Sequence, residues 1–478
     1  MKSKKLIFYI LLFALLIMGF FARKYKIDTP VADWFSWRQT DTAAVGRFYA
    51  RDGINVMKPR FYDLSSIQSG IENPNGYRMV EFPAYSAAFA FLYKTFGQVS
   101  IETWARVVTS VLSLAALAVI YILLYEETGL FGAFFGSLFF AVFPYVVFYS
   151  HTILPDMPAT SLAVLSLYFT YRYARGKSWI HLIFALLLFA LGLLVKPMVI
   201  FYGFVHLYLI VFASGRRGKK ALLALLIFSL SALPVYLWRS YIQQFPEGIP
   251  ASSWLLTSVS TPTGMHEIFM RPAFFRWIFY ERINNLILGG YVMFFLIYGF
   301  FYKTKQTLLH YAFALSALSY LFVFQGGNVQ HDYYQIIITP ALAMLLGYGV
   351  QLFINQRQLG FLIVRVFTVI VLFGASLAFS YYQVKAYYNQ NSDWLLIADV
   401  IRSVTSPQDT LVLDALGDTT ILYLSDRRGY PAPYKELSEF KKQGADYFVT
   451  TNSDYKNKFK DSTFSLIFEN GKVLVFRL

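Results

Sequence analysis

The sequence contains no cysteine. Disulfide bonds, thiolate metal ligands and cysteine nucleophiles are therefore excluded, and any exported part must fold without covalent cross-links. Charged residues are also scarce, because they make up 14% of the chain whereas soluble domains carry about 25%. Hydrophobic residues make up 57% of the 478 residues and lie in long runs. The composition therefore predicts a polytopic α-helical membrane protein whose main solvent is lipid.

The formal net charge is +15. The basic residues gather in short clusters beside apolar segments, which is typical of cytoplasmic loops that contact anionic membrane lipids. This distribution argues against a nucleic-acid partner. The clusters lie at Lys2–Lys5, Arg172–Lys177, Arg216–Lys220 and Lys303–Lys305.

About eleven apolar segments approach the roughly 20 residues that a helix needs to cross a bilayer. The first follows a basic N-terminus and lacks a small-residue cleavage site behind it, which indicates an uncleaved anchor rather than a signal peptide. The fifth and sixth segments meet at Lys196 and Pro197, and form either a hairpin or one kinked helix. The segments lie at about 5–22, 103–125, 129–150, 157–175, 179–195, 197–214, 220–240, 284–302, 306–325, 333–354 and 360–383.

An N-terminus on the cytoplasmic side places the short basic loops inside, as the positive-inside rule requires. The long first loop (about 23–102), the loop at about 242–283 and the C-terminal tail then face outward. In the first loop, residues 37–52 have the spacing of an amphipathic helix lying on the bilayer, and the aromatic stretch 82–96 is too short to span it. The sequence thus predicts a multi-pass protein of the cell membrane whose active site faces outward.

After about residue 384 the sequence no longer contains long apolar runs. Short apolar strands are predicted at 410–414 and 446–450, with a helix at 434–442 between them. Two further strands, 464–468 and 472–477, flank Asn470 and Gly471, which are typical of a hairpin turn. We therefore expect a membrane domain at 1–383 and a small α/β domain outside the membrane at 384–478.

Ionisable residues near membrane depth are costly, and each is therefore a candidate for function. One set lies in the predicted outer loops or at the outer ends of spans, so we expect folding to bring its members together in one pocket. The set comprises Asp33, Arg38, Asp41, Glu81, His151, Asp156, Lys196, His331 and Asp332.

Asp33 and Asp41 lie near the start of the predicted helix in the first loop. Either carboxylate could act as a general base on an acceptor hydroxyl. The structural alternative is a helix cap at Asp33 and a solvated helix residue at Asp41. Trp37 and Gln39 favour a site, because an aromatic face and a polar group together suit a sugar ring and its hydroxyls. His151 is a further candidate for contact with the sugar or the acceptor.

Asp156, Lys196 and the segment 331–334 also have two interpretations. Asp156 lies between two prolines at the start of a span and is either a site carboxylate or an N-cap. Lys196 is either a counter-ion for a lipid phosphate or a side chain that extends to the interface. His331 could donate to a phosphate leaving group, whereas Tyr333 and Tyr334 suit either the same phosphate site or an interfacial aromatic belt.

Five motifs occur in order within residues 1–383, namely Ser36-Trp-Arg-Gln39 with Asp41-Thr-Ala, Glu81-Phe-Pro-x-Tyr85, Leu154-Pro-Asp156, Leu194-Val-Lys-Pro197 and His331-Asp-Tyr-Tyr334. The ordered set resembles a bacterial group of GT-C class glycosyltransferases. This group is related to protein O-mannosyltransferases and to the aminoarabinose transferase of lipid A.

The resemblance implies an inverting transfer of a sugar from a polyprenyl-phosphate donor to a hydroxyl acceptor, without a nucleotide donor. It also implies a general base in the first outer loop and a second acidic residue, Asp156, in the next one. Arg38 and Gln39 occupy the place of the acidic pair that usually opens the first helix in this group. Asp33, Asp41 and Glu81 therefore all stay candidates for the base.

The departing lipid phosphate gains negative charge, which Arg38, Lys196 or His331 could stabilise. These cations suffice without a metal, so no cofactor is expected to be required, although paired carboxylates could bind a divalent ion. The expected partners are membrane lipids, a polyprenyl-phosphate sugar and a hydroxyl acceptor on a lipid, glycan or protein.

Two other classes of protein share some of these features. A transporter or lipid flippase of cell-envelope precursors would place charged sites near the bilayer midplane, often in repeated halves. Here the polar residues gather at one predicted face and no repeat is evident, which favours the enzyme. A non-catalytic assembly protein is less favoured, because the chain has no large hydrophilic domain.

Overall fold

The computed structural model describes residues 2–215, 218–252, 254–261, 264–268, 270–302, 308–460 and 462–478. By its contacts the chain forms two compact units. Unit 1 comprises Met1–Ile27, Arg106–Trp238 and Ser252–Tyr387, and unit 2 comprises Asp28–Ala105, Arg239–Ala251 and Tyr388–Leu478. The boundary after residue 383 stays a prediction. Four basic residues of the predicted inner loops lie outside the described residues, namely Arg216, Arg217, Lys303 and Lys305.

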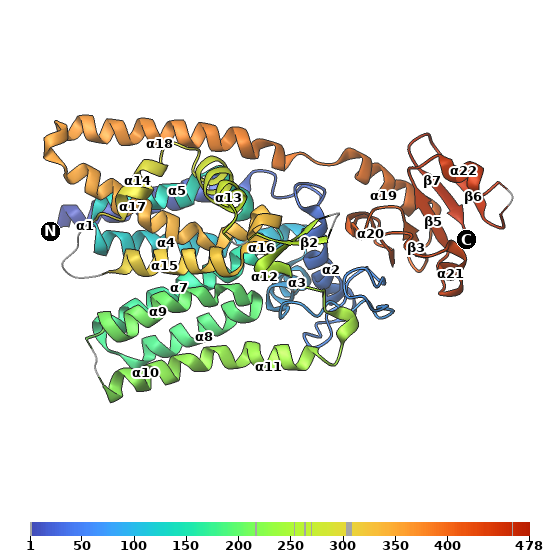
Figure 1. The fold of residues 1–478 in the computed structure, drawn as a ribbon, viewed down its shortest axis with the longest axis horizontal. Helices are drawn as coiled ribbons and strands as arrows, with labels where there is room; N and C mark the ends of the chain where they lie inside the picture. The colour runs from blue at the N-terminus through green and yellow to red at the C-terminus, as the bar shows by residue number, and fades with distance from the viewer. Residues whose placement is uncertain are drawn as a thin grey trace. The chain divides into compact units, whose positions relative to one another are not determined.

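Unit 1 consists mainly of helices that run side by side (Figure 1). Five helical stretches are long and apolar enough to cross a membrane: Lys5–Lys24, Ile101–Glu127, Lys219–Ile242, Asp332–Asn355 and Leu362–Val404. Shorter apolar helices lie at Leu130–Val142, Trp179–Val195, Pro197–Ala213 and Leu309–Val323. The predicted helical membrane-protein fold is therefore confirmed.

The helices that lie wholly or partly in unit 1 include α1 (Lys2–Lys24), α4 (Ile101–Glu127), α5 (Leu130–Val142), α6 (Pro144–Tyr149), α7 (Asp156–Gly176), α8 (Trp179–Val195), α9 (Gly203–Tyr208), α10 (Lys219–Ser229), α11 (Leu233–Ile242), α14 (Met293–Gly299), α15 (Leu309–Val323), α16 (Gln325–Gln330), α17 (Thr339–Asn355) and α18 (Leu362–Val384). A short antiparallel pair, β1 (Ser258–Thr261) and β2 (Gly264–Glu267), lies in the predicted second outer loop.

The fifth and sixth apolar segments form a hairpin rather than one kinked helix. Lys196 has extended backbone angles and ends α8, and Pro197 begins a short 3-10 helix. The ring of His206 in α9 then lies 4.6 Å from the ring of Phe189 in α8. In one continuous helix these two residues would be about 25 Å apart. The chain therefore reverses direction at Lys196, at the end of a membrane helix.

Arg23 is buried in unit 1, although its sequence position suggests an outer-loop charge. Its guanidinium donates to the Ser113 hydroxyl at 2.7 Å and to the carbonyl oxygen of Ala141 at 2.9 Å. It also contacts Gly19 and Ser150. A buried charge is tolerated when its donors are satisfied in this way. Arg23 thus connects α1 to the α4–α6 region.

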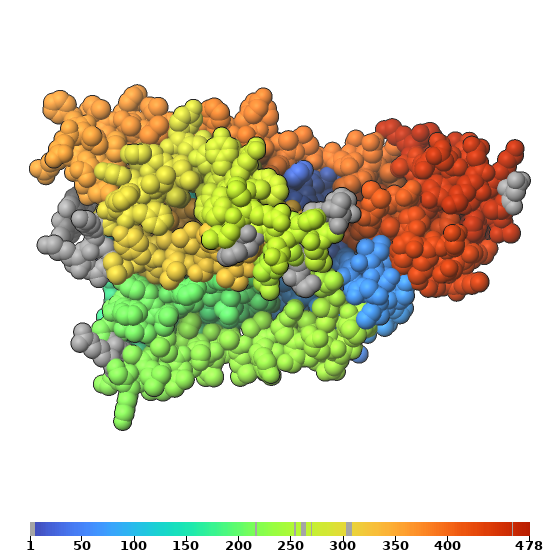
Figure 2. Space-filling view, viewed as in Figure 1, coloured from blue at the N-terminus to red at the C-terminus, as the bar shows by residue number. Residues whose placement is uncertain are grey.

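The exposed side chains of α18 indicate the environment of unit 1. This helix lies along one edge of unit 1 (Figure 2). Large apolar side chains on it are strongly exposed, with Ile363 at 77%, Phe367 at 65% and Tyr382 at 70%. Soluble proteins rarely expose contiguous apolar surface of this kind. A helix of 23 residues with such a surface fits contact with the hydrocarbon core of a bilayer.

Unit 2 contains the predicted C-terminal α/β fold. Its five-stranded sheet has the order β4-β3-β5-β7-β6, with β3 parallel to β4 and β5, and β7 antiparallel to β5 and β6. The predicted strands are present, and Gly471 has a φ of +77° in the turn expected between the last two. Strand β4 was not predicted, since three residues carry little periodicity. The bounds are α19 (Ser392–Val404), β3 (Thr410–Leu413), α20 (Thr420–Ser425), β4 (Arg428–Tyr430), α21 (Leu437–Lys442), β5 (Tyr447–Thr450), α22 (Asp454–Lys458), β6 (Ser465–Glu469) and β7 (Leu474–Arg477).

Part of the first loop pairs with the five-stranded sheet of unit 2 and packs into its core. The Gly429 N–H in β4 donates to the carbonyl of Tyr62, and the Leu64 N–H donates to the carbonyl of Gly429. Leu64 is also part of the hydrophobic core that includes Val412 and Phe448. Residues 62–64 thus extend the sheet beyond β4, so the first loop and the tail share one core.

Helix α2 (Ser36–Asp52) confirms the helix expected at 37–52, but it is not a surface helix. Its polar residues Arg38, Gln39, Thr40 and Asp41 are all buried. Helix α3 (Ala84–Phe96) packs against it. At Gly46 a Cβ atom would lie 1.9 Å from the Phe89 ring, so only glycine permits this approach. The polar side of α2 is therefore buried within the protein, and the position of this helix on the bilayer stays a prediction.

Candidate active site

Asp33 is held by the first turn of α2 rather than capping it. The residue before the helix is Phe35, which has a left-handed backbone with φ 55° and no side-chain cap. The Gln39 side-chain amide donates to Asp33 Oδ1 at 2.7 Å and to the carbonyl of Trp34 at 3.1 Å. The capping interpretation of Asp33 is therefore wrong, and Gln39 fixes its buried carboxylate.

Arg38 and Glu81, two predicted site residues, form an ion pair in unit 2. Arg38 Nη2 lies 2.5 Å from Glu81 Oε1, and the two side chains are 6% and 15% exposed. A second nitrogen of Arg38 donates to the hydroxyl of Thr42 at 3.2 Å. The pair connects α2 to the segment before α3, and it places a charge of each sign beside the start of α2.

Asp41 is the most completely enclosed of the first-loop acids that were predicted. Arg78 Nη2 lies 3.0 Å from Asp41 Oδ2, and the side chain of Asp41 is 0% exposed. The Thr419 hydroxyl, which comes from a position 378 residues further along the chain, donates to Asp41 Oδ1 at 2.8 Å. The solvated-helix interpretation of Asp41 is therefore wrong. Both of its oxygens are held in place, one by a cation and one by a hydroxyl donor.

Two further acids in unit 2 interact electrostatically with Asp41, and neither was predicted as a site residue. Asp63 is fully buried and accepts a hydrogen bond from the Ser65 N–H at 2.8 Å. Burial raises the pKa of Asp63 to about 7, and the negative charge of Asp41 acts in the same direction while Arg78 opposes it. Burial also raises the pKa of Asp418, again with a contribution from Asp41. Asp63 lies in a loop without periodicity, and Asp418 resembles an ordinary helix cap, so neither has a clear signal in the sequence.

The raised pKa of Asp63 predicts a pH-dependent stability. The folded state binds this proton more tightly than the unfolded state, in which the pKa is near 3.8. The free energy of unfolding should therefore fall as the pH rises from about 4 to about 7, by at most about 1.4 kcal/mol for each pH unit in that range. We expect thermal unfolding of the full chain in detergent to show this decline, and Asp63→Asn to weaken it.

The matched control for Asp63→Asn is Asp52→Asn, whose side chain is 45% exposed at the end of α2. This variant should keep the decline of the wild type. An unchanged pH dependence in Asp63→Asn would contradict the assigned titration.

In unit 1, Asp156 and Lys196 form a buried ion pair. Lys196 Nζ lies 3.3 Å from Asp156 Oδ1, with the side chains 8% and 0% exposed. The same ammonium lies 5.1 Å from the centre of the Tyr334 ring, a cation–π distance. Lys196 therefore does not extend to the interface, and Asp156, which begins α7 without a side-chain cap bond, is not an N-cap.

In the segment 331–334, His331 is half-buried and the three residues that follow it are buried. Tyr333 and Tyr334 are 1% and 7% exposed, so the belt interpretation is wrong. The His331 ring stacks on Tyr333 at 5.2 Å between ring centres. His151, predicted to contact sugar or acceptor, is buried, and one ring nitrogen lies 3.3 Å from the carbonyl oxygen of Val147. The roles of these residues stay predictions.

Asp332, beside His331, is the centre of a second polar cluster in unit 1. Its carboxylate accepts hydrogen bonds from Tyr149 at 2.6 Å and from Tyr387 at 2.5 Å. Arg282 Nη1 lies 3.4 Å from the same carboxylate and is 28% exposed. Arg282 was not predicted as a site residue; it lies at the end of the predicted second outer loop, in a π-helix at Arg276–Ile287. Among the described residues, no group of three or more His, Asp and Glu could hold a metal ion.

Comparison with known proteins identifies the class to which this fold belongs. Residues 81–238 match the family model for dolichyl-phosphate-mannose-protein mannosyltransferases. The match covers a third of the chain and includes Glu81, Asp156 and Lys196. Together with the structural matches below, it confirms the predicted resemblance to GT-C glycosyltransferases, and the fold is the GT-C membrane fold. The comparison with curated proteins gives no match.

Three solved structures illustrate the likeness. ArnT from Cupriavidus metallidurans bound to undecaprenyl phosphate is 13% identical with a TM-score of 0.64, over 97% of each chain. The Archaeoglobus fulgidus oligosaccharyltransferase is 11% identical with a TM-score of 0.56, over 92% of this chain and 68% of that one. The mycobacterial arabinofuranosyltransferase AftD is 12% identical with a TM-score of 0.56, over 98% of this chain and 41% of that one. At these identities the likeness shows the fold.

Proposed function

We propose that this chain is a glycosyltransferase that moves a sugar from a polyprenyl-phosphate donor to a hydroxyl acceptor at the outer face of the cell membrane, with inversion at the anomeric carbon. The observation that carries the proposal is the buried carboxylate of Asp41, fixed by Arg78 and Thr419 within the GT-C fold. A carboxylate held in one orientation is what a general base needs, because proton transfer depends on geometry first.

In this scheme Asp41 takes the proton of the acceptor hydroxyl while that oxygen attacks the anomeric carbon of the donor sugar. The bond from this carbon to the phosphate oxygen breaks, and the polyprenyl phosphate leaves with the bonding electrons. Asp33 and Glu81 support the site differently, since each is paired with a residue in the first turn of α2. Asp33 is bonded to Gln39, and Glu81 is bonded to Arg38.

Nearby cations and hydrogen-bond donors stabilise the negative charge that develops on the departing phosphate. We propose Arg38 in unit 2 and Lys196 and His331 in unit 1 for this role. Tyr334 lies beside Lys196 and Tyr333 beside His331 within unit 1. The bond of Lys196 to Asp156 fits the role, because an approaching phosphate can compete for an ammonium that one carboxylate holds at 3.3 Å. Undecaprenyl phosphate is bound in the similar ArnT structure, which supports a lipid phosphate as the donor carrier.

The experiment that tests the proposal uses the purified full chain in detergent. It is incubated with radiolabelled polyprenyl-phosphate hexoses and pentoses and with lipid and glycan fractions of the cell envelope. We expect label to move to an acceptor, unlabelled polyprenyl phosphate to accumulate, and the product to have the opposite anomeric configuration. A transporter or flippase would leave the sugar–phosphate bond intact, so donor that stays intact with every acceptor fraction contradicts the proposal.

A further inference from the structure

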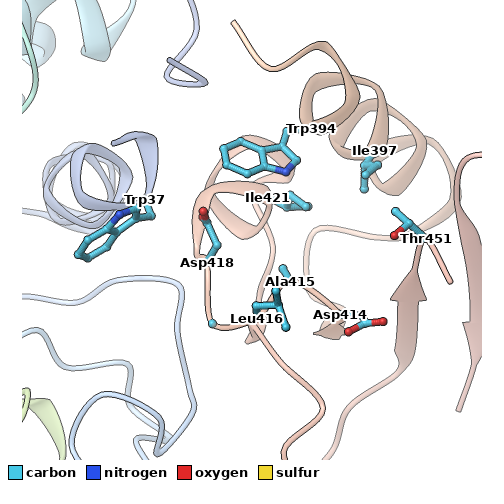
Figure 3. Close-up of a pocket in the computed structure, with 10 residues that line it drawn as sticks. Trp37, Trp394, Ile397, Asp414, Ala415, Leu416, Asp418, Ile421 and Thr451 are labelled. Carbon is cyan, nitrogen blue, oxygen red and sulfur yellow. The ribbon is translucent and has the colours of Figure 1, made fainter. Parts of the chain in front are cut away.

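A cavity of about 560 Å³ opens in unit 2 beside the start of α2 (Figure 3). Its volume is within the range of roughly 300–1,000 Å³ that is typical of small-ligand pockets. Two tryptophans from distant parts of the chain line it, Trp37 from α2 and Trp394 from α19. The remaining lining residues are Ile397, Asp414, Ala415, Leu416, Gly417, Asp418, Ile421 and Thr451.

The two tryptophans are positioned by specific contacts. The Asn391 side chain caps α19 by accepting from the N–H groups of Asp393 and Trp394. The Asn391 N–H donates in turn to the carbonyl of Ala32, immediately before Asp33, at 2.8 Å. The cap thus fixes Trp394 to the same stretch of first loop that leads into Trp37. In the view of Figure 3 the Asp418 side chain is drawn between the two indoles.

The cavity is adjacent to the proposed base. Trp37 and Asp41 are four residues apart on α2 and therefore lie on the same side of the helix. Asp418 also lines the cavity, and its neighbour Thr419 donates to Asp41. The Thr420 hydroxyl also lies 3.1 Å from the Ser36 hydroxyl, which closes the contact between α20 and α2. A molecule in the cavity is therefore bordered by Trp37, which lies one helical turn before Asp41, and by Asp418, which precedes the Thr419 that donates to Asp41.

The lining chemistry suits a carbohydrate. Indole faces pack against the C–H faces of sugar rings, and carboxylates accept hydrogen bonds from hydroxyls. Asp414 accepts from the Thr450 hydroxyl through Oδ2, and Asp418 accepts from the Thr420 N–H through Oδ1. Among the described residues, the other oxygen of each carboxylate accepts no hydrogen bond, so it is available to ligand hydroxyls. A polyprenyl chain, in contrast, would have to pass two carboxylates in this cavity.

We propose that this cavity is the acceptor subsite, and that it binds a saccharide whose hydroxyl is presented to Asp41. The proposal rests on the proposed function and adds the class of acceptor, a glycan rather than a polypeptide or a simple lipid. Trp37 and Trp394 hold the sugar rings, and Asp414 and Asp418 fix their orientation through hydroxyl groups.

The first test measures binding without catalysis. Saturation-transfer NMR is recorded on the full chain in lipid nanodiscs with mannotriose, maltotriose and chitotriose as probes, and with a Ser/Thr-containing hexapeptide as the comparison. We expect transfer to the ring protons of at least one saccharide, weakened about tenfold in affinity by Trp394→Ala, since one aromatic contact contributes about 1 kcal/mol or more. Trp277→Ala, which removes a tryptophan that is 43% exposed in unit 1, is the matched control.

Several outcomes would overturn the proposal. They are no saccharide binding to the wild type, saccharide binding that Trp394→Ala leaves unchanged, and binding of the peptide instead in a manner that depends on Trp394.

The second test uses transfer kinetics. Trp394→Ala and Asp418→Asn should raise the KM for a glycan acceptor about tenfold with a much smaller change in kcat, because they remove binding contacts rather than the base. Asp399→Asn, a change on an exposed part of α19, should match the wild type. Sugar transfer with an unchanged acceptor KM in both cavity variants would refute the subsite and leave the proposed function standing. Saccharide binding without any transfer would refute the proposed function and leave a saccharide-binding cavity.

Discussion

Asp41→Asn is expected to lower kcat for sugar transfer by about 10²–10⁴-fold, the usual contribution of a general base. The amide has nearly the same shape but cannot take the proton of the acceptor hydroxyl. Because the substitution also leaves Arg78 buried without its carboxylate, thermal unfolding must be measured on the same samples. The proposed role requires a loss of kcat in protein that is still folded at the assay temperature.

The other first-loop acids provide the internal comparison. Asp33→Asn and Glu81→Gln should lower kcat by about tenfold, because they loosen Gln39 and Arg38 rather than remove the base. Asp52→Asn, at the exposed end of the same helix, should retain full activity. If Asp41→Asn stays within about threefold of the wild type while Asp33→Asn loses more than about a hundredfold, the base is Asp33.

Lys196→Met is expected to have the largest effect in unit 1, on both stability and activity. It leaves the carboxylate of Asp156, which is 0% exposed, without the ammonium that lies 3.3 Å away. Breaking a buried ion pair by removing one partner typically costs about 3–5 kcal/mol. We expect a clear fall in the thermal unfolding temperature, together with loss of kcat/KM for the polyprenyl-phosphate donor.

A double variant separates the two consequences. Removal of both charges, in Asp156→Asn with Lys196→Met, should restore most of the stability, since no uncompensated charge remains. Its kcat/KM for the donor should nevertheless stay at least about tenfold below that of Asp156→Asn alone, because the cation for the phosphate is still missing. Equal values in the double and the single variant would show that Lys196 only neutralises Asp156.

Conservative replacement provides a further readout at this position. Lys196→Arg keeps the positive charge and can still pair with Asp156 and with a phosphate. It should therefore retain more stability and more donor affinity than Lys196→Met. If Lys196→Arg retains more stability and donor affinity than Lys196→Met, position 196 requires a positive charge. If both variants lose them equally, the position requires the shape of the lysine side chain.

Composition and hydrophobic periodicity were sufficient for the membrane fold, for many of the helices and for most strands of the tail. The predicted segments 129–150 and 284–302, however, are each divided in the structure. These features depend on short stretches of chain, in which the spacing of apolar residues sets helix or strand and the length of an apolar run sets a span. The Asn470-Gly471 turn is of the same kind. Strand β4 was missed because its three residues become a strand only through pairing with β3 and with the first loop.

The sequence by itself therefore determined the lipid environment, the helices and a set of polar residues with the order seen in GT-C glycosyltransferases. Only the tertiary structure decided how those residues pair. The bond of Asp41 to Thr419 joins positions 378 residues apart, and the pairs Arg38–Glu81 and Asp156–Lys196 likewise join separate segments. The physical reason is that burial and charge pairing depend on distances in the folded chain, which the local pattern of residues does not contain. For the same reason Asp63 and Arg78, which belong to no sequence motif, could be recognised as neighbours of Asp41 only in the folded structure.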